Sequence, residues 1–474
     1  MEEKGQVDTD PQAVAGESIP SALADDSRDG QTVDRVDANP QLFVVQAGKE
    51  PEDAVGNISG DAASDPQTLL QDETYPEGGL EAWLVVFGSF CGLVSSLGVM
   101  NSIAIFQTYN AAHQLSGYSE GTIGWIYSIY TFLAFGGGVY IGPLFDKYGP
   151  RWLILPGGLG GVASLMLMSV CTRYWHFVLV FSLLNGVCAS LVFTPCFTAV
   201  GHFFKKRRGL ATGIASSGGG VGGVIFPLVL QRLFDRLGWA WALRIVGFMC
   251  LFLAAVCNLL VHKRLPAARN SSVHPDFKIL KDPAFLFTTI GVFMLEFALF
   301  IPIAYISSYA LYAGFDQSLS FYILTILNAS SVFGRLLPGY WADIIGPFNS
   351  NMLSVLVTIV ACLGVWLPAG HTLPGIVVFA VLFGFGTGSN ISITPVCVGE
   401  LCHTQQYGRY YATCYTVVSF ACLVGIPVGG SIVTACGGDY WGVIVFTGLV
   451  EVLSLLSFQM AKVARVGWNP WVKF

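Results

Sequence analysis

Long apolar stretches, separated by short polar ones, fill the chain from residue 82 to residue 463. A helix needs about 17 to 25 apolar residues to cross the hydrocarbon core of a bilayer, and nearly every stretch reaches that length. Because that core holds no water, each stretch must satisfy its own backbone hydrogen bonds, which favours α-helices. The pattern therefore predicts an all-α membrane protein with twelve transmembrane helices. The predicted helices cover residues 82–106, 122–144, 152–170, 175–200, 209–230, 239–261, 285–309, 318–341, 352–367, 375–398, 410–433 and 441–463.

Polar segments divide these helices into two bundles of six. Residues 79–262 form the predicted N-terminal bundle, residues 263–284 a cytosolic linker, and residues 285–465 the C-terminal bundle. Residues 1–78 are rich in Asp, Glu, Gly, Ser and Pro and poor in aromatic residues. They cannot bury enough apolar surface to fold, so they are predicted to form a disordered tail. Residues 466–474 are expected to be a short cytosolic C-terminal tail.

Lys and Arg residues are unequally divided between the two sides of the predicted membrane. Loops rich in these residues stay in the cytosol. One side has fifteen such cations, whereas the other has only Arg173, Arg232 and Arg236. Both termini and the linker are therefore predicted to be cytosolic, and the plasma membrane is the expected location. The fifteen cations are Lys147, Arg151, Lys205, Lys206, Arg207, Arg208, Lys263, Arg264, Arg269, Lys278, Lys281, Arg409, Lys462, Arg465 and Lys473.

The composition supports a membrane protein and argues against several other classes. Hydrophobic residues make up 53% of the chain and charged residues 11%, against about 25% charged residues in soluble domains. No basic stripe with interleaved aromatic residues is present, so nucleic acid is not an expected partner. The spacing of the twelve cysteines indicates neither a disulfide framework nor a metal site. No nucleophile, base and orienting group form a recognisable motif, so the chain is not expected to be an enzyme or to need a cofactor.

One short pattern occurs twice, each time after the second predicted helix of a bundle. The segments GPLFDKYGP and GYWADIIGP both read Gly-x-x-x-Asp-x-x-Gly-Pro and place Asp146 and Asp343 in corresponding turns, 197 residues apart. A Thr-Pro pair recurs at residues 194–195 and 394–395; it predicts a helix kink, a role in gating, or both. Parallel repeats are typical of transporters. The chain is therefore predicted to contain a duplicated six-helix unit.

The repeated motif and the twelve predicted helices resemble the major facilitator superfamily, in which two six-helix bundles surround a central site. More narrowly, the segment EGGLEAW at residues 77–83 resembles the opening motif of the monocarboxylate transporter family. The segment FFKKRRGLATG at residues 203–213 resembles the second motif of that family, at the entrance to the fifth helix. The long acidic tail is similar to that of the fungal branch. The resemblance implies alternating-access transport of small carboxylates, often with a proton.

Two positions distinguish this chain from family members that carry lactate-type substrates. Those members have a lysine late in the first helix, where this chain has Asn101. They also have an aspartate four residues before an arginine in the eighth helix, where this chain has Ser331 and keeps Arg335. Two of the three charged groups associated with proton coupling are thus absent. Some fungal relatives carry riboflavin and others resemble exporters beside biosynthetic pathways, so the resemblance leaves the substrate open.

Charged residues inside predicted helices are the first candidates for a site, because a charge within the bilayer is costly. Arg335 can offer two parallel donors to a carboxylate or another planar anion; a structural bond to a carbonyl or to a neighbouring helix is the alternative. Glu296, in the seventh helix, is the candidate for proton coupling, with helix pairing as the alternative. Glu451 and Arg244 are interpreted as packing charges.

Neutral polar residues complete the predicted site, because a cavity needs a few hydrogen-bonding groups among apolar walls. Asn101, Tyr305, Asn390 and Thr394 are the candidates for substrate binding. Each of them, taken alone, is also explained as a contact between packed helices. As a set they favour a substrate that is larger and less purely ionic than lactate.

Asp146, Arg151 and Asp343 are the candidates for a conformational gate. In the family that the chain resembles, the corresponding turns form salt bridges that hold one state closed and break on switching. Ordinary turn chemistry at a helix end is the alternative. The first copy of the motif carries Lys147 and Arg151, whereas the second has uncharged residues nearby. The gate is therefore expected to depend more on the first half.

The sequence as a whole predicts a secondary transporter. The expected activity is movement of a small organic anion, a monocarboxylate or related metabolite, across the plasma membrane by alternating access. The proton is a candidate coupling ion, and membrane lipid is the expected surrounding. Within transport, the alternatives are an efflux pump for a secondary metabolite of a biosynthetic pathway and a riboflavin-type facilitator. A receptor of transporter-like fold that signals through its tail is an alternative from another class.

Overall fold

The computed structural model describes residues 75–264, 277–469 and 472–474. Within these ranges the regular structure is entirely helical, without a strand, as the apolar pattern predicts. The predicted disordered tail, residues 1–78, lies almost wholly outside the described residues, and so does most of the predicted linker. Neither of these two predictions is therefore tested.

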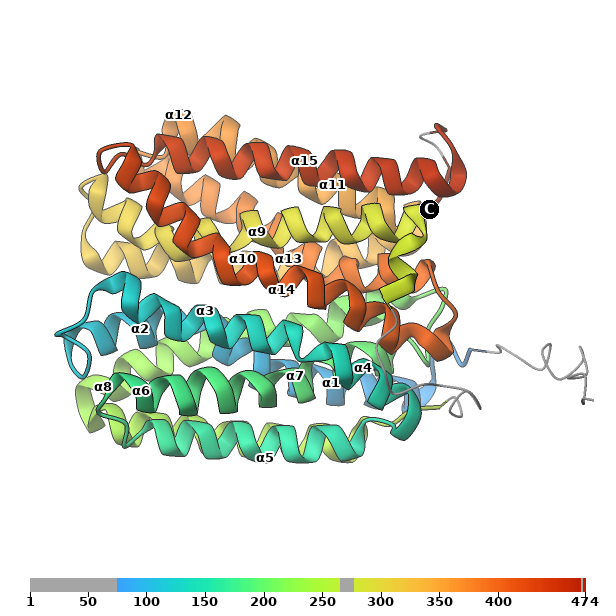
Figure 1. Ribbon diagram of the computed structural model, residues 1–474, viewed down its shortest axis with the longest axis horizontal. Helices are drawn as coiled ribbons and strands as arrows, with labels where there is room; N and C mark the ends of the chain where they lie inside the picture. Colours follow the sequence, from blue (N-terminus) through green and yellow to red (C-terminus); the bar gives the residue numbers. More distant parts are fainter. Residues whose placement is uncertain (1–74, 265–276, 470–471) are drawn as a thin grey trace, which may run out of the picture. The chain divides into compact units, whose positions relative to one another are not determined.

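The first half of the described chain contains eight α-helices and one π-helical segment. Figure 1 shows these elements gathered on one side of the second half, with the long helices running roughly parallel. The elements are α1 (Gly79–Asn101), α2 (Ile103–Ala112), α3 (Glu120–Gly136), α4 (Gly138–Tyr148), α5 (Arg151–Met168), α6 (Tyr174–Phe177), the π-helix η1 (Val178–Asn185), α7 (Gly186–Val200) and α8 (Arg208–Leu260).

The second half repeats the arrangement with long helices of similar length. Its helices α10 and α14 pack against α8 and against α3 and α4 of the first half, as Figure 1 also shows. The elements are η2 (Phe277–Lys281), α9 (Pro283–Tyr312), α10 (Gln317–Ile345), α11 (Pro347–Ile359), the π-helix η3 (Val360–Trp366), α12 (Leu367–Ala369), α13 (Leu373–Glu400), η4 (Thr404–Gln406), α14 (Tyr407–Ala435) and α15 (Trp441–Val466).

Ten helical segments within the described ranges are long and apolar enough to cross a membrane. One of them, α8, runs for 53 residues, but Gly238 interrupts it with φ 73° and ψ 174°. Glycine adopts this left-handed conformation without steric cost, so the chain turns there and α8 consists of two helical arms. Helix α10, with 29 residues, is not among the ten. The predicted number of twelve spans therefore stays a prediction.

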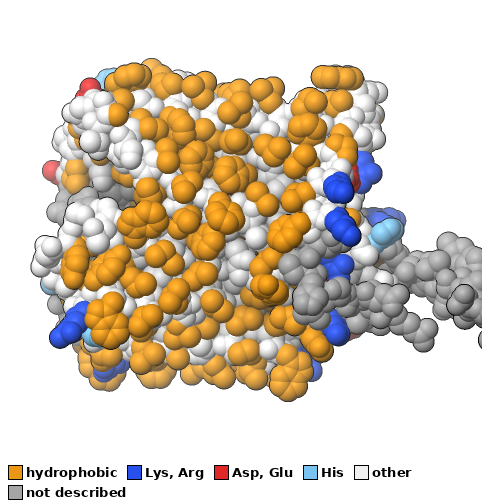
Figure 2. All heavy atoms as spheres, in the orientation of Figure 1, with side chains coloured by type: hydrophobic (Ala, Val, Ile, Leu, Met, Phe, Trp, Pro, Cys, Tyr) orange, Lys and Arg blue, Asp and Glu red, His pale blue; other side chains and the backbone are white. Residues whose placement is uncertain are grey.

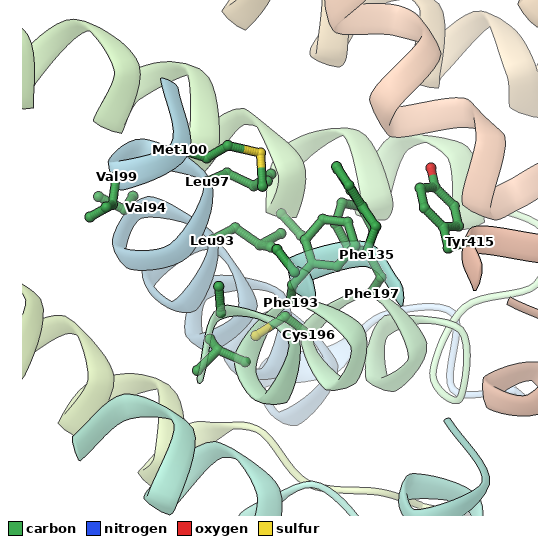
Figure 3. Packing of buried hydrophobic residues seen from close by; sticks show 14 of the residues in the cluster. Leu93, Val94, Leu97, Val99, Met100, Phe135, Phe193, Cys196, Phe197 and Tyr415 are labelled. Atoms are coloured by element: carbon green, nitrogen blue, oxygen red, sulfur yellow. The ribbon is translucent and has the colours of Figure 1, made fainter. Parts of the chain in front are cut away.

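Apolar side chains both fill the interior and cover the outside of the helices. Figure 2 shows hydrophobic side chains spread over the face in view, with Lys, Arg, Asp and Glu near its two ends. Such a broad apolar exterior is unusual for a soluble monomer and fits contact with lipid. Figure 3 shows the interior, where Leu93 and Leu97 of α1 point toward the side of α7 that carries Phe193 and Phe197, close to Phe135.

Candidate functional site

The two repeated aspartates close one end of the space between the halves, and each binds the half that it does not belong to. Asp146 of α4 accepts hydrogen bonds from the backbone N–H groups of Gly408 and Arg409, at 3.2 and 3.0 Å. These groups belong to the first turn of α14. We call this contact the first latch. Unpaired N–H groups and the helix dipole make such a helix N-terminus a favourable place for a carboxylate.

The second latch is the same contact with the halves exchanged. Asp343 of α10 accepts hydrogen bonds from the backbone N–H groups of Gly209 and Leu210, at 2.7 and 2.9 Å. These groups lie in the first turn of α8. Motif glycines permit the approach, since a Cβ on Gly142 would lie 2.1 Å from the Gly408 carbonyl oxygen. We call this side of the molecule the latch end.

Arg151, the third residue of the predicted gate, takes no part in either latch. Its side chain is exposed at the start of α5. Within the described ranges Asp146 has no cation within 4.0 Å of its carboxylate, and its partners are backbone N–H groups instead. The salt bridges implied by the family resemblance are therefore replaced, in this state, by caps on helix N-termini.

Two further residues hold the latch end, and sequence reasoning did not assign them this role. Glu77 accepts hydrogen bonds from the backbone N–H groups of Lys205, Lys206 and Arg207, at 2.9, 2.6 and 3.1 Å. Arg208 is buried and extends toward the second half, where its Nη2 donates to the Thr404 hydroxyl at 3.5 Å. The signals were the EGG motif and the basic run, but only the fold brings them together.

A buried histidine lies beside the first latch. The ring of His202 packs edge-on against Phe145, 5.4 Å between centroids, and neither of its nitrogens has a hydrogen-bond partner. Burial, together with the nearby cations Arg208, Arg264 and Lys263, lowers the pKa of His202 from 6.5 to about 3. The ring is therefore neutral at physiological pH.

A cavity of about 1160 Å³ lies between the two halves. Trp125, near the beginning of α3, and Leu311, near the end of α9, line it and are 44% and 50% exposed. Both residues lie far along their helices from the latch end. Arg335 and Glu296 also line the cavity, but each is only 2% exposed. The cavity is thus open opposite the latches and closed toward them.

Arg335 lies at the closed end of the cavity, where α10 packs against α8. Its Nη1 donates to the backbone oxygen of Ser216 at 2.5 Å, while its buried Nε has no hydrogen-bond partner. A Cβ on Gly219 would lie 2.5 Å from Nη1, so the glycine-rich face of α8 makes room for the guanidinium. The group is therefore bound at one nitrogen and keeps donor capacity for a ligand.

Glu296 of α9 is the second charged group of the cavity wall. It interacts electrostatically with Arg335, but no ion pair within 4.0 Å joins the two side chains in the described part of the chain. The predicted anion-binding and proton-coupling residues are thus brought together in one cavity without neutralising each other through direct contact.

The four neutral candidates separate into two pairs. Asn101 and Tyr305 line the cavity, although each is already bonded to a neighbouring helix: Asn101 Nδ2 to the Gly219 oxygen at 2.9 Å, and the Tyr305 hydroxyl to the Ile426 oxygen at 2.9 Å. Asn390 and Thr394 are completely buried in α13 and do not line the cavity.

An aromatic cluster closes the cavity toward the latch end. Phe135 of α3 packs edge-on against Phe193 of α7, 5.2 Å between centroids, and lies 5.5 Å from the ring of Tyr415 in α14. Phe197 and Tyr411 continue the stack beyond the cavity. No group of three or more His, Cys, Asp or Glu residues within the described ranges is arranged to hold a metal ion.

Comparisons with known proteins agree with this architecture. The family model described as Major Facilitator Superfamily matches residues 85–426. The aspyridones efflux protein of Emericella nidulans is 38% identical over 375 residues, which cover 79% of this chain and 76% of that protein. The riboflavin transporter of Saccharomyces cerevisiae is 34% identical over 426 residues, 85% of this chain and 82% of that protein.

A solved structure gives the same result for the fold. The crystal structure of a human organic anion transporter superposes with a TM-score of 0.63 at 16% identity, covering 81% of this chain and 100% of that one. A similarity at this level of identity concerns the fold alone. With a family match over most of its length and relatives above one-third identity, the chain belongs to the major facilitator superfamily.

Proposed function

We propose that the protein is a secondary transporter for an organic anion, working by alternating access with the latch end toward the cytosol of the plasma membrane. The observation that carries the proposal is Arg335, a buried cation with an unused donor at the closed end of a cavity between the halves. A buried charge is expensive unless an opposite charge accompanies it. A planar carboxylate can supply that charge and accept two parallel hydrogen bonds.

The size of the cavity favours a substrate larger than lactate. Its volume of about 1160 Å³ exceeds the range of about 300 to 1,000 Å³ for sites that hold drug-sized ligands. Phe135, Phe193 and Tyr415 supply aromatic surface near Arg335 and Glu296. We therefore propose an amphipathic acid with an apolar or aromatic body, and keep the small monocarboxylate as the simpler member of the same class.

Export of a secondary metabolite is the direction that the relatives favour. The aspyridones efflux protein, named for its cargo, is 38% identical to this chain. Riboflavin transport is the second candidate, supported by the 34% identity with the yeast riboflavin transporter and by the aromatic surface at the closed end of the cavity. A neutral flavin ring would depend on these aromatics more than on Arg335, whereas an acid would depend on Arg335.

The proton enters the proposal through Glu296. A substrate carboxylate bound at Arg335 brings a second negative charge close to Glu296, which favours uptake of a proton by that residue. Release of the substrate at the other side would then release the proton. The charge balance around Arg335 couples the two events without a direct ion pair.

Reconstitution of the purified protein into proteoliposomes would test the proposal. The labelled panel is lactate, pyruvate, riboflavin and an amphipathic aromatic carboxylic acid, each measured with and without a proton gradient. We expect Arg335→Ala and Arg335→Lys to lower transport of the acid by about 10- to 100-fold, because bonds to a charged group contribute about 1.5–3 kcal/mol. Transport of the acid that is unchanged in both variants would contradict the proposal.

Arg244→Lys provides a matched control. Arg244 is also an arginine on a membrane helix, but its Nε donates to the Ser169 hydroxyl at 3.3 Å and it does not line the cavity. We expect normal transport by this variant. Loss of riboflavin transport by Phe193→Ala, with the acid unaffected, would favour the flavin candidate.

A further inference from the structure

Glu451 is a carboxyl group that the proposed transport cycle has not used. It lies in α15, outside the cavity lining, and its side chain is completely buried. In the described part of the chain no cation lies within 4.0 Å of it, and its Oε1 has no hydrogen-bond partner. An ionised carboxylate in such a place would cost several kcal/mol.

The hydrogen bonds of Thr358 indicate which form of Glu451 is present. The Thr358 hydroxyl oxygen lies 2.7 Å from the Val355 carbonyl oxygen and 2.7 Å from Glu451 Oε2. A hydroxyl has one hydrogen to donate, and a carbonyl can only accept. With an ionised Glu451 the two acceptors would have to share the single Thr358 hydrogen, whereas two full hydrogen bonds form when Thr358 donates to Val355 and a protonated Glu451 Oε2 donates to Thr358. The geometry therefore favours the carboxylic acid.

Glu451 lies at almost the same depth in the membrane as Glu296. The Ser454 hydroxyl donates to the Gly291 oxygen at 2.7 Å, which fixes the register of α15 against α9. Glu296 lies five residues beyond Gly291, about 7.5 Å along the axis, and Glu451 lies three residues before Ser454, about 4.5 Å along the antiparallel helix. The two carboxyls thus differ in depth by only about 3 Å and interact electrostatically.

We propose that Glu451 is a second proton-binding site of the carrier, which holds a proton in the state described here and exchanges it with Glu296 during the transport cycle. The inference rests on the proposed transport function. In the exchange the O–H bond at Glu451 Oε2 breaks, and a Glu296 carboxylate oxygen accepts the proton. The Thr358 hydroxyl then turns from Val355 to Oε2 and supplies the ionised Glu451 with a donor.

The exchange would move negative charge out of the cavity. When Glu296 carries the proton, it no longer competes with the substrate anion for Arg335. The negative charge then resides on Glu451, behind α9. The other groups that interact with Glu296 are Tyr411, Cys414, Tyr415 and Cys422 of α14, and Cys362 of η3 interacts with Glu451. These are neutral phenols and thiols, so Arg335 is the cation that distinguishes the two carboxyls.

Infrared difference spectroscopy of the full-length purified protein tests the proposal without a substrate. A carboxylic acid has a C=O stretching band that a carboxylate lacks. We expect such a band in the wild type and its loss in Glu451→Gln, with Glu296→Gln assigning the second carboxyl. Opening the latch end with Asp146→Asn and Asp343→Asn should lower the Glu451 band and raise the Glu296 band. A Glu451 band that is absent at neutral pH, or that does not change on opening, would overturn the proposal.

Transport provides the second readout. Glu451→Gln imitates the protonated form, so exchange of labelled for unlabelled acid should continue at a rate within about twofold of the wild type. Accumulation driven by a proton gradient should fall about tenfold, because a fixed amide cannot take part in proton exchange. Unchanged accumulation would overturn the proposal. If the wild type transported no member of the panel, that result would contradict the proposed function. The infrared measurement would still test the protonation of Glu451, because it needs no substrate.

Thr358→Val is the control for a purely structural effect of Glu451→Gln. This variant keeps the shape of the side chain but removes the acceptor of the Glu451 proton. We expect a shifted Glu451 band and slower proton-driven accumulation, with the melting temperature of the purified protein close to that of Glu451→Gln. A band that stays in place would show that the acid does not donate to Thr358.

Discussion

The first and second latches share the same contact between an aspartate and a helix N-terminus, but the residues around that contact differ. In each, an aspartate accepts from the second and third N–H groups of a helix in the opposite half. A lysine that follows the last long helix of each half supports each latch: Lys263 donates to the Lys147 oxygen at 3.1 Å, and Lys473 to the Asp343 oxygen at 2.5 Å. A cation there also compensates the negative end of a helix dipole.

The surroundings of the two latches differ because, among the described residues, the C-terminal segment at Phe474 covers the second latch and no such segment covers the first. The Phe474 oxygen accepts from the backbone N–H groups of Phe348 and Asn349, at 2.9 and 3.3 Å, and the rings of Phe474 and Phe348 stack 4.4 Å apart. The first latch instead has exposed Arg151 nearby. The sequence favoured the first half because of its charges, but the second latch has the shorter hydrogen bonds. Backbone donors at helix ends, more than side-chain charges, determine this contact.

Removing the latch aspartates should have the largest effect on the closure of the latch end. Asp146→Ala or Asp343→Ala leaves two N–H groups at each helix end without their acceptor. Hydrogen bonds to a charged group contribute about 1.5–3 kcal/mol each, so the loss of two of them corresponds to about 3–6 kcal/mol. We therefore expect the latch end to open about 100- to 10,000-fold more often. Asp343→Ala should have the larger effect because its hydrogen bonds are shorter, and the double variant should remain mostly open.

Cys402 provides the measurement of opening. It lies between α13 and η4, and burial raises the pKa of its thiol to about 12, which keeps the reactive thiolate scarce while the latch end is closed. Opening should therefore accelerate its labelling by a membrane-impermeant maleimide added at the latch end. Cys402→Ser corrects for the other cysteines. Labelling at the wild-type rate in the double variant would contradict the role of the latches.

Removing the cover of the second latch should have an intermediate effect. Phe474→Ala deletes a stacked aromatic pair, which is worth about 0.5–1.5 kcal/mol, so Cys402 should be labelled about 2- to 10-fold faster. Lys263→Ala is the comparison variant at the first latch, where the described residues include no stacked ring pair like that of Phe474 and Phe348. If both variants accelerate labelling equally, the extra contacts of the second latch contribute nothing to closure.

Acid should distinguish the two latches by the smallest effect. His202, beside the first latch, has its pKa lowered to about 3 by burial and neighbouring cations, whereas its counterpart in the repeat, Cys402, does not gain charge in acid. In the unfolded chain His202 takes up a proton near its ordinary pKa of 6.5, whereas in the folded, closed form it does so only near a pKa of about 3. The contribution of His202 to the free energy of unfolding should therefore be fully present above about pH 6.5 and be lost as the pH falls from about 6.5 toward 3.

His202→Gln should flatten this dependence. The measurement is the melting temperature of the purified protein between neutral pH and about pH 4, within the window set by the two pKa values. Equal slopes for the variant and the wild type would show that other groups cause the loss.

The sequence predicted much of the molecule because its main signals are local. Long apolar runs predict helices wherever water is absent, and two copies of one turn place Asp146 and Asp343 in equivalent positions. A lone arginine in an apolar helix is costly in any fold, which is why the sequence alone makes Arg335 a candidate. The structure places Arg335 in the lining of the cavity, and its role in binding stays a prediction.

What the sequence could not supply were contacts between distant segments. Nothing near Asp146 indicates that its partners are N–H groups more than 250 residues away. Asn390 and Arg335 are both polar residues within apolar helices, yet only Arg335 is turned toward the cavity. The sequence indicates only a packing charge at Glu451. The proposal that it holds a proton depends on the contacts of the Thr358 hydroxyl with both the Val355 oxygen and Glu451 Oε2.

The two latch aspartates contact the halves reciprocally: Asp146 of the first half binds the second, and Asp343 of the second half binds the first. In a symmetric dimer of two identical chains, any residue that contacts its partner is contacted in the same way in return. The latches have this form within one chain: each repeat presents a carboxylate and receives one at its own helix end. The two latches therefore give the two halves of the described chain a self-complementary interface. Two copies within one polypeptide need not stay identical, and in the described residues the contacts of Phe474 are made at the second latch alone.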